Sequence, residues 1–497
     1  MKEFGLFING QWEAAKGGKT TQSINPATEE PWATVAVADR EDARKAVAAA
    51  KKAHDAGVWR GTPKEERAEV LRKIAAGIGE RAEELAAAEA LDSGATIRKS
   101  TLADVPSTAD TFLKFADALM ADEEETVFEE AAPVPSRNII RKEPIGVCVG
   151  IVPWNFPMLM ASWKIAPALA AGNTVVIKPA SNTPVTALLM GEICSQAGVP
   201  DGVVNVISGP GGSIGEELAS HPDVGKVAFT GSTEVGRRIM QLASGTVKKV
   251  TLELGGKSPN IILDDADLDT AALAALFGTF FHQGQICESG TRVLVQKDQY
   301  DTFVEKMIAG SSKIQLGDTM DMMTSMGPLV SKTQYDTVEN YVGVGKDEGA
   351  ECVLGGSRPE GMEKGYYYSP TIFAGVDNKM RIAQEEIFGP VVSVIPYDDE
   401  ADAVGIANDS MYGLGGAVWS QNEERALGVA RQIETGTVWI NDYHLLNARF
   451  PFGGYKQSGV GRELGAWGLH EYQEVKHIHV GENVPADQKI YFGMLFN

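Results

Sequence analysis

The region between residues 146 and 253 constrains the fold most, because short apolar runs alternate there with segments of helical pattern. These runs are 146–152, 174–177, 203–207, 227–230 and 249–253. Such runs indicate strands buried on both faces, and helical connections place these strands in a parallel sheet. The sequence therefore predicts an α/β fold with a doubly wound, Rossmann-like sheet. A second α/β series over residues 265–455 predicts a further α/β unit.

Two glycine-rich turns follow strands of this first series. They are Ser208–Gly215 and Phe229–Gly236, and each precedes a segment of helical pattern. Backbone N–H groups at the start of a helix bind phosphate, so both turns are candidates for contact with a dinucleotide. The first turn lacks GxGxxG spacing and is explained equally well as a tight structural turn. Two such openings on consecutive units favour a bound dinucleotide.

Capping signals mark two helices near the N-terminus. Asp39 is suited to cap a helix that stops at Gly57. Thr62 and Glu65 have the spacing of a capping box, which predicts a second helix running towards Gly94.

Charge and cysteine usage exclude several classes of function. The chain has 497 residues, which predicts more than one domain, and its 45 basic and 67 acidic residues give a net charge of −22. This charge argues against a nucleic-acid or anionic-membrane partner. Without a signal-peptide pattern, a transmembrane run or CxxC spacing, we expect a cytoplasmic protein without disulfides. No histidine and cysteine cluster has metal-ligand spacing, so no metal is expected.

Three polar residues stand out in apolar or glycine-rich surroundings. Asn155 lies between aromatic residues and prolines, where it is either a turn former or a donor for an oxyanion. Glu253 ends an apolar strand, a position suited to a general base. Cys287 follows a glycine-rich segment and is either a packed core residue or a nucleophile.

The chain resembles the aldehyde dehydrogenase superfamily. Six motifs occur in the order found in that superfamily: 153–157, 229–236, 253–257, 284–287, 385–390 and 451–456. The resemblance extends from a hairpin at 7–12 to about residue 480.

The resemblance implies three regions. Residues 1–122 and 145–253 form a cofactor-binding domain, and residues 254–460 form a catalytic α/β domain. Residues 123–144 and 461–497 form a small β oligomerisation arm with a C-terminal tail. The implied assembly is a homodimer or homotetramer, and the apolar tail end is expected to dock on a neighbouring subunit.

The resemblance also implies an activity and catalytic roles. The activity is oxidation of an aldehyde to the carboxylic acid, with hydride transfer to NAD or NADP. Cys287 is implied as the nucleophile that forms a thiohemiacetal and then a thioester. Glu253 is implied as the base for hydrolysis, Asn155 as the oxyanion donor and Lys164 as a proton relay.

Residues for the cofactor and the substrate are implied in the same way. The cofactor residues are Ile151, Trp154, Lys178, Ser181, Gly211, Gly231, Ser232, Leu254, Glu386 and Phe388. Ser181 departs from the pattern, because many NAD-preferring relatives have a glutamate there that repels a 2′-phosphate. We therefore expect use of both NAD and NADP. The pocket residues are Phe156, Leu159, Trp163, His444, Leu446, Phe450 and Phe452, which predict an uncharged aliphatic or aromatic aldehyde.

Two rival functions use the same residues differently. A CoA-acylating aldehyde dehydrogenase passes the acyl group to CoA, and Glu253 disfavours it because that enzyme does not need this base. A cofactor-independent cysteine hydrolase is disfavoured by the two glycine-opened helices. Formation of reduced nicotinamide with and without CoA distinguishes these functions.

Overall fold

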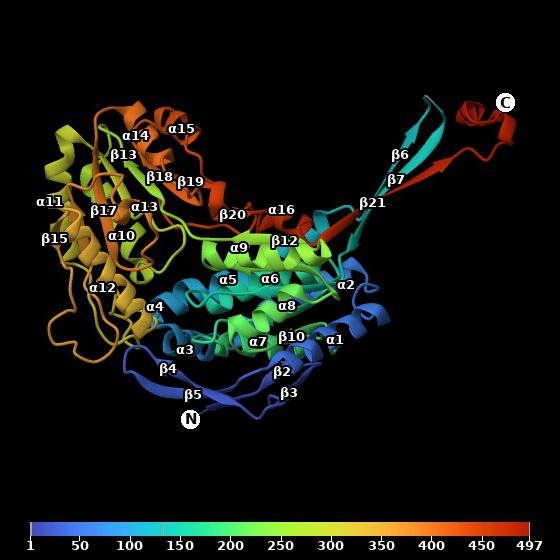
Figure 1. Cartoon of the computed structure of the whole chain (residues 1–497), viewed down its shortest axis with the longest axis horizontal. Coiled ribbons are helices and arrows are strands. Elements are labelled where there is room, and N and C mark those ends of the chain that lie inside the picture. The colour runs from blue at the N-terminus through green and yellow to red at the C-terminus, as the bar shows by residue number, and fades with distance from the viewer. Residues whose placement is uncertain (1, 133, 497) are drawn as a thin grey trace.

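The computed structural model describes residues 2–132 and 134–496, while Met1, Pro133 and Asn497 lie outside the described residues. Two α/β units lie side by side, and a long β arm projects from one of them (Figure 1). The predicted α/β class with a Rossmann-like sheet is confirmed. None of the helices in the described residues is both long and apolar enough to cross a membrane.

The first unit contains an eight-stranded sheet with five parallel strands in its middle. In spatial order these are β12 (Lys249–Glu253), β11 (Val224–Thr230), β8 (Val147–Ile151), β9 (Thr174–Lys178) and β10 (Val204–Val206). The predicted hairpin, β2 (Leu6–Ile8) and β3 (Gln11–Glu13), extends this sheet beyond β10. The strand order reverses between β8 and β11. A crevice at such a switch point, at the carboxyl ends of the strands, is where doubly wound sheets bind ligands.

Helices cover both faces of this sheet, because successive strand residues point to opposite sides. Val147 and Val149 of β8 pack with one set of helices, and Cys148 packs with the other. The first set is α1 (Arg40–Ala56), α8 (Glu216–Ser220) and α9 (Thr233–Ala243). The second set is α2 (Lys64–Glu80), α3 (Ala82–Ser93), α5 (Val105–Ala121), α6 (Pro157–Ala170) and α7 (Val185–Gln196). A separate small sheet contains β1 (Lys2–Phe4), β5 (Glu30–Ala36) and β4 (Thr20–Asn25).

The capping predictions are half confirmed. Asp39 caps α1 in a capping box with Asp42, and Gly57 ends the helix with a φ of +74°. The capping box at Thr62 is wrong, because its hydroxyl donates to the Val58 carbonyl instead. The helix predicted to run towards Gly94 is two helices, which meet at Arg81.

The second unit contains a seven-stranded sheet, parallel except for β15 at one edge. Its spatial order is β15 (Glu351–Leu354), β16 (Thr371–Ala374), β17 (Val391–Tyr397), β14 (Arg292–Gln296), β13 (Pro259–Ile262), β18 (Gly415–Trp419) and β19 (Thr437–Ile440). One face packs against α10 (Leu268–Phe280) and α11 (Tyr300–Ser311). The other face packs against α12 (Lys332–Asp347), α13 (Arg381–Gln384), α14 (Glu400–Asn408) and α15 (Glu423–Ala430).

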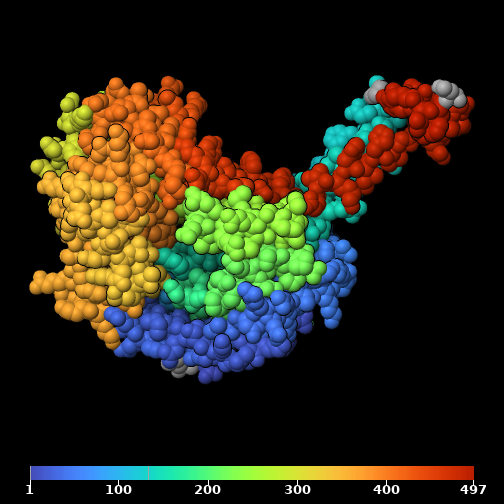
Figure 2. All heavy atoms as spheres, in the orientation of Figure 1, coloured from blue at the N-terminus to red at the C-terminus, as the bar shows by residue number. Residues whose placement is uncertain are grey.

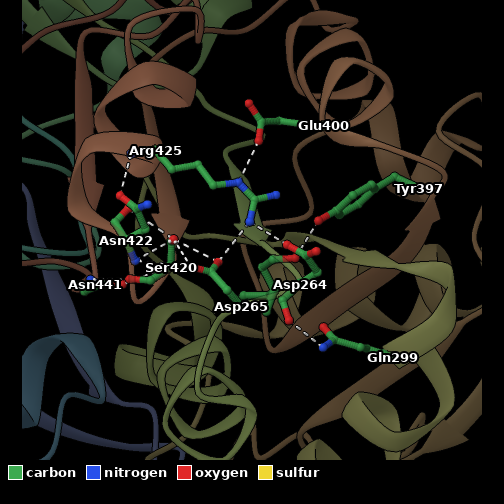
Figure 3. Close-up of polar contacts among 10 residues, drawn as sticks. Asp264, Asp265, Gln299, Tyr397, Glu400, Ser420, Asn422, Arg425 and Asn441 are labelled. Atoms are coloured by element: carbon green, nitrogen blue, oxygen red, sulfur yellow. Dashed lines mark hydrogen bonds and ion pairs between the residues drawn. The ribbon is translucent and has the colours of Figure 1, made fainter.

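A polar cluster ties the end of β13 to α14 and α15 (Figure 3). The Arg425 guanidinium contacts Asp264 at 2.5 Å, Asp265 at 3.2 Å and Glu400 at 2.9 Å. Ser420, just after β18, donates its hydroxyl to Asp265 at 2.7 Å. Because the cluster pairs opposite charges, we interpret it as a structural cluster that holds these elements together.

The arm is a three-stranded antiparallel sheet that stands away from both units (Figures 1 and 2). Its strands are β21 (Gln473–Gly481), β7 (Ser136–Pro144) and β6 (Glu125–Glu130). The tail folds into short 3₁₀ turns, Ala486–Gln488 and Ile490–Met494, beside the tip of the arm.

The chain returns to the first unit before it enters the arm. β20 (Gly459–Val460) pairs with β12, and α16 (Gly465–His470) packs on α5 and α6. The sequence-based boundary gave residues 459–460 to the catalytic domain and residues from 461 onwards to the arm. The structure instead attaches residues 459–472 to the first unit, because they complete its edge and its helical layer. At this crossing the Leu254 N–H donates to the Ser458 carbonyl at 2.9 Å.

Candidate active site

A cavity of about 660 Å³ lies between the two α/β units, at the carboxyl ends of β8, β11 and β12 of the first unit. It brings together most of the residues singled out in the sequence. These are Trp154, Asn155, Phe156, Leu159, Trp163, Gly231, Ser232, Glu253, Leu254, Cys287, Glu386, Phe388, His444, Leu446 and Phe452. They come from segments up to about 300 residues apart, so only the tertiary fold assembles them.

Six of the predicted residues do not line this cavity. Ile151 and Lys178 end β8 and β9, while Ser181 and Gly211 lie in the turns after β9 and β10. Lys164 is fully buried within α6. The prediction that Phe450 lines the pocket is not met in this chain. The Phe450 N–H closes a turn with the Asn447 carbonyl, and the residue is 61% exposed.

Cys287 lies in a loop between α10 and β14 that another segment of the backbone approaches closely. The loop begins with His282 and Gln283 at φ values of +50° and +58°, which non-glycine residues seldom adopt. Gly256 passes so close that a Cβ there would lie 2.3 Å from the Cys287 carbonyl oxygen. Withdrawal from water, and then the Glu288 and Glu253 charges, raise the pKa of the thiol well above its ordinary value.

Asn155 is held from both ends. Its side-chain amide donates one hydrogen bond to the Gln285 carbonyl at 2.8 Å, two residues before Cys287. Its backbone carbonyl lies 2.7 Å from Nε2 of His282. A side-chain amide has two N–H donors, so one remains for the cavity that Asn155 lines.

Glu253 ends β12 with its carboxyl group 2% exposed. Its Oε2 has no hydrogen-bond partner among the described residues. Burial, and then the charge of Glu463, raise the pKa of Glu253 well above its ordinary value of 4.5. Behind it, the Lys164 ammonium contacts Glu463 at 2.5 Å. The Glu253 carboxyl group and a buried ion pair therefore lie next to each other.

The strand ends of the first unit fit a dinucleotide. Alanine side chains at Gly211 and Gly212 would meet no atom within 4 Å, so there is open space beside the backbone of this turn. Ser232 caps α9, whose N-terminus lies at the cavity. Burial lowers the pKa of Lys178 to about 8, and its ammonium donates to the Pro179 carbonyl at 2.7 Å. The Ser181 hydroxyl donates to the Gly209 carbonyl at 3.1 Å.

Groups from the second unit face these strand ends. Glu386 accepts a hydrogen bond from the Gly256 N–H at 3.1 Å, and burial raises its pKa to about 7. Phe388, at a φ of +56°, packs edge-on against Trp154 with ring centroids 5.1 Å apart. The Glu386 carboxyl group and two aromatic rings therefore line the cavity near these strand ends.

One residue at this site, Glu288, was not singled out by the sequence analysis. The Glu288 carboxylate lies 3.3 Å from the Cys287 sulfur through Oε2, and 3.2 Å from Nδ1 of His444 through Oε1. Adjacency to Cys287 was the signal available, but the sequence does not show the turn in which Cys287 and Glu288 lie. Within the described part of the chain, no group of three histidine, cysteine, aspartate or glutamate side chains is placed to hold a metal.

The fold and the cavity are typical of a dinucleotide-dependent oxidoreductase, and comparison with known proteins narrows this class. Residues 12–478 match the Aldehyde dehydrogenase family. A betaine aldehyde dehydrogenase from Bacillus subtilis is 47% identical over 477 residues, which cover 95% of this chain and 96% of that protein. An aldehyde dehydrogenase from Alternaria alternata is 46% identical and covers 96% of this chain and 95% of its own.

Solved structures agree with these relatives. The NAD⁺ complex of betaine aldehyde dehydrogenase from Staphylococcus aureus superposes with a TM-score of 0.94. It is 42% identical, over 97% of this chain and 95% of that chain. The NAD⁺ complex of an aldehyde dehydrogenase from Bacillus cereus gives a TM-score of 0.93 at 45% identity, over 97% of each chain.

The chain belongs to the aldehyde dehydrogenase family. The activity predicted from the sequence is confirmed: oxidation of an aldehyde to the carboxylic acid with a nicotinamide cofactor.

Proposed function

We propose that Cys287, Asn155 and Glu253 carry out this oxidation as nucleophile, oxyanion donor and base for hydrolysis. The observation that carries the proposal is their meeting in one cavity beside the strand ends of the first unit. The Cys287 sulfur attacks the aldehyde carbon, and the side-chain N–H of Asn155 and the backbone N–H of Cys287 stabilise the oxygen that becomes negative. When bound, the nicotinamide accepts the hydride that converts the thiohemiacetal to a thioester.

Glu253 then takes a proton from the water that hydrolyses the thioester. Its raised pKa makes this carboxylate a stronger base than an exposed glutamate. The Lys164–Glu463 pair lies behind Glu253 and is suited to pass the proton onwards. Cys287→Ser tests the proposal, because loss of the first turnover of reduced nicotinamide is expected, whereas a normal first turnover contradicts it.

We propose that both NAD and NADP are used. Ser181 places a neutral hydroxyl, bonded to Gly209, where a carboxylate would repel a 2′-phosphate. Two similar proteins were solved with NAD⁺, which supports NAD as one of the cofactors. Comparing kcat/KM for the two cofactors, with Ser181→Glu as the matched variant, decides the question. A wild-type NAD preference that Ser181→Glu leaves unchanged contradicts the proposal.

We propose an uncharged aliphatic or aromatic aldehyde as substrate. Apolar rings and chains make up much of the cavity lining, including Trp163 and Phe452, whose ring centroids lie 5.3 Å apart. A quaternary ammonium aldehyde is the second candidate, because these aromatic faces attract cations and two of the relatives are betaine aldehyde dehydrogenases. Betaine aldehyde and 3,3-dimethylbutanal have nearly the same shape, so the ratio of their kcat/KM values measures the preference for charge.

We propose a cytoplasmic homo-oligomer that assembles through the arm. The arm exposes Val127, Phe128, Val475 and Ile478, and apolar side chains gather on the tail at its tip. The four cysteines are free, as expected for a reducing compartment. Sedimentation of the full chain, compared with a Val475→Lys variant, tests the assembly, and an unchanged mass contradicts this use of the arm.

A further inference from the structure

The carboxylate of Glu288 links the Cys287 thiol to the His444 imidazole in one continuous chain of contacts. The Cys287 sulfur lies 3.3 Å from Oε2 of Glu288, and Oε1 lies 3.2 Å from Nδ1 of His444. All three residues line the cavity, and the side chains of Glu288 and His444 are 6% and 5% exposed. Among the described residues, Glu288 is the only hydrogen-bond partner of this thiol.

The far end of the chain fixes where its protons lie. Nε2 of His444 faces the Gly278 carbonyl at 3.1 Å, and a carbonyl only accepts, so Nε2 carries a proton. One further proton is then shared between Nδ1 and Oε1. This proton joins Oε1 to Nδ1, so Oε2 of Glu288 is free to accept the hydrogen of the thiol.

The surrounding residues hold this arrangement in place. His444 has a φ of +65°, a left-handed conformation that non-glycine residues adopt mainly where the surroundings impose it. Phe277, Phe281 and Tyr443 surround its ring, with centroids 5.4, 5.7 and 4.8 Å away. The Tyr443 hydroxyl donates to the backbone carbonyl of Glu288 at 2.8 Å. Contacts to its side chain and to its backbone therefore both fix the position of Glu288.

The thiol needs a proton acceptor at the moment of attack. Its raised pKa disfavours a standing thiolate at neutral pH, and the Glu288, Glu253 and Glu386 carboxylates all disfavour the negative sulfur. Of these groups, only Glu288 is hydrogen-bonded to the sulfur. General-base removal of the proton resolves the conflict, because sulfur then never carries a lasting charge beside three carboxylates.

We propose that Glu288 is the general base that deprotonates Cys287, and that His444 is a positioning residue that holds Glu288. The proposal rests on the proposed function, in which Cys287 is the nucleophile. The S–H bond breaks and its proton moves to Oε2, while the sulfur electron pair forms the bond to the aldehyde carbon. The carbonyl π pair moves to oxygen. Hydrolysis of the thioester later frees the sulfur, which takes the same proton back from Glu288.

In this mechanism, a different carboxylate acts as the base in each half of the reaction. Glu288 serves the attack of sulfur, and Glu253 serves the attack of water. Each base then returns to its starting state without passing a proton to the other.

Glu288→Gln tests the proposal, because it keeps the size of the side chain and removes the base. Two measurements are made on the full-length variant: single-turnover hydride transfer to NAD, and alkylation of Cys287 by iodoacetamide followed on its peptide by mass spectrometry. We expect both rates at pH 7 to fall by about a hundredfold, the lower range for loss of a general base. Glu288→Asp is expected to recover part of each rate.

A purely electrostatic role gives the opposite sign in the alkylation assay. If Glu288 only repels the thiolate, Glu288→Gln lowers the pKa of the thiol and Cys287 reacts faster. An alkylation rate at or above wild type therefore overturns the proposal, as does unchanged hydride transfer. Cys287→Ser, measured in parallel, reports separately on the proposed function through its loss of hydride transfer.

His444→Asn tests the positioning role and carries the test if Glu288→Gln does not fold. Asparagine tolerates a positive φ but is too short to replace the imidazole, so backbone strain is not added. We expect the alkylation profile to move to higher pH, with about a tenfold slower reaction at pH 7. An unchanged profile, with an unchanged melting temperature, overturns the role of His444.

Discussion

Replacing Gly256 with alanine places a methyl group against the loop that carries Cys287. The new Cβ would lie 2.3 Å from the Cys287 carbonyl oxygen, whereas ordinary contact begins at about 3.4 Å. The two segments must therefore separate by about 1.1 Å, the difference between 3.4 and 2.3 Å. Displacing a reacting group by about 1 Å costs about a hundredfold in rate, or about 2.7 kcal/mol of transition-state stabilisation.

The assay is kcat/KM for aldehyde oxidation by Gly256→Ala, read together with the melting temperature and NAD binding. We expect the hundredfold loss with the cofactor still bound, because the methyl group acts on the position of Cys287. Gly428→Ala in α15 is the matched control, since a Cβ there meets no atom within 4 Å. Its activity should be unchanged, with a gain in stability of about 0.5–1 kcal/mol from better helix propensity. Activity of Gly256→Ala within threefold of wild type would refute the reasoning.

Four other perturbations have clear expected outcomes. Glu253→Gln should release one equivalent of reduced nicotinamide per active site and then stall by about 10²–10⁴-fold, whereas steady turnover would assign hydrolysis to another base. Because the pKa of Glu253 is raised and its base form exists above that pKa, wild-type steady-state turnover should rise with pH through it; a pH-independent kcat would contradict this. Asn155→Ala should lower kcat about 10²–10³-fold with normal NAD binding. Deleting residues 482–497, which expose Ile490, Met494 and Leu495, should alter assembly or substrate range, and no change in either would remove the tail from both roles.

Local signals in the sequence predicted those parts of the fold that depend on neighbouring residues. Asp39 was recognised as a cap because its partners lie two and three residues away. The Gly231–Ser232 opening was recognised because a buried strand and an amphipathic helix flank it. Glu253 was singled out because a carboxylate at the end of an apolar strand is unusual.

Features that depend on distant contacts were missed. The Thr62 signal failed because the carbonyl of Val58 competes for its hydroxyl. The exposure of Phe450 follows from a loop whose path no local pattern specifies. The position of the Glu288 carboxyl group depends on a contact with His444, which is 156 residues away in the sequence. A local sequence pattern does not show which distant residues come into contact.

The paired crossing at Leu254 and Ser458 has a mechanical consequence. The chain passes between the two α/β units once at each of these residues, and the two passages are bonded side by side. The Ser458 carbonyl accepts the Leu254 N–H at 2.9 Å. The Ser458 hydroxyl donates to the Gly255 carbonyl at 2.7 Å and accepts the Gly413 N–H at 2.9 Å. A hinge made of two cross-linked strands resists bending far more than a single linker. We therefore expect cofactor and product to leave through movements of side chains and loops around a stiff frame, without the units swinging apart.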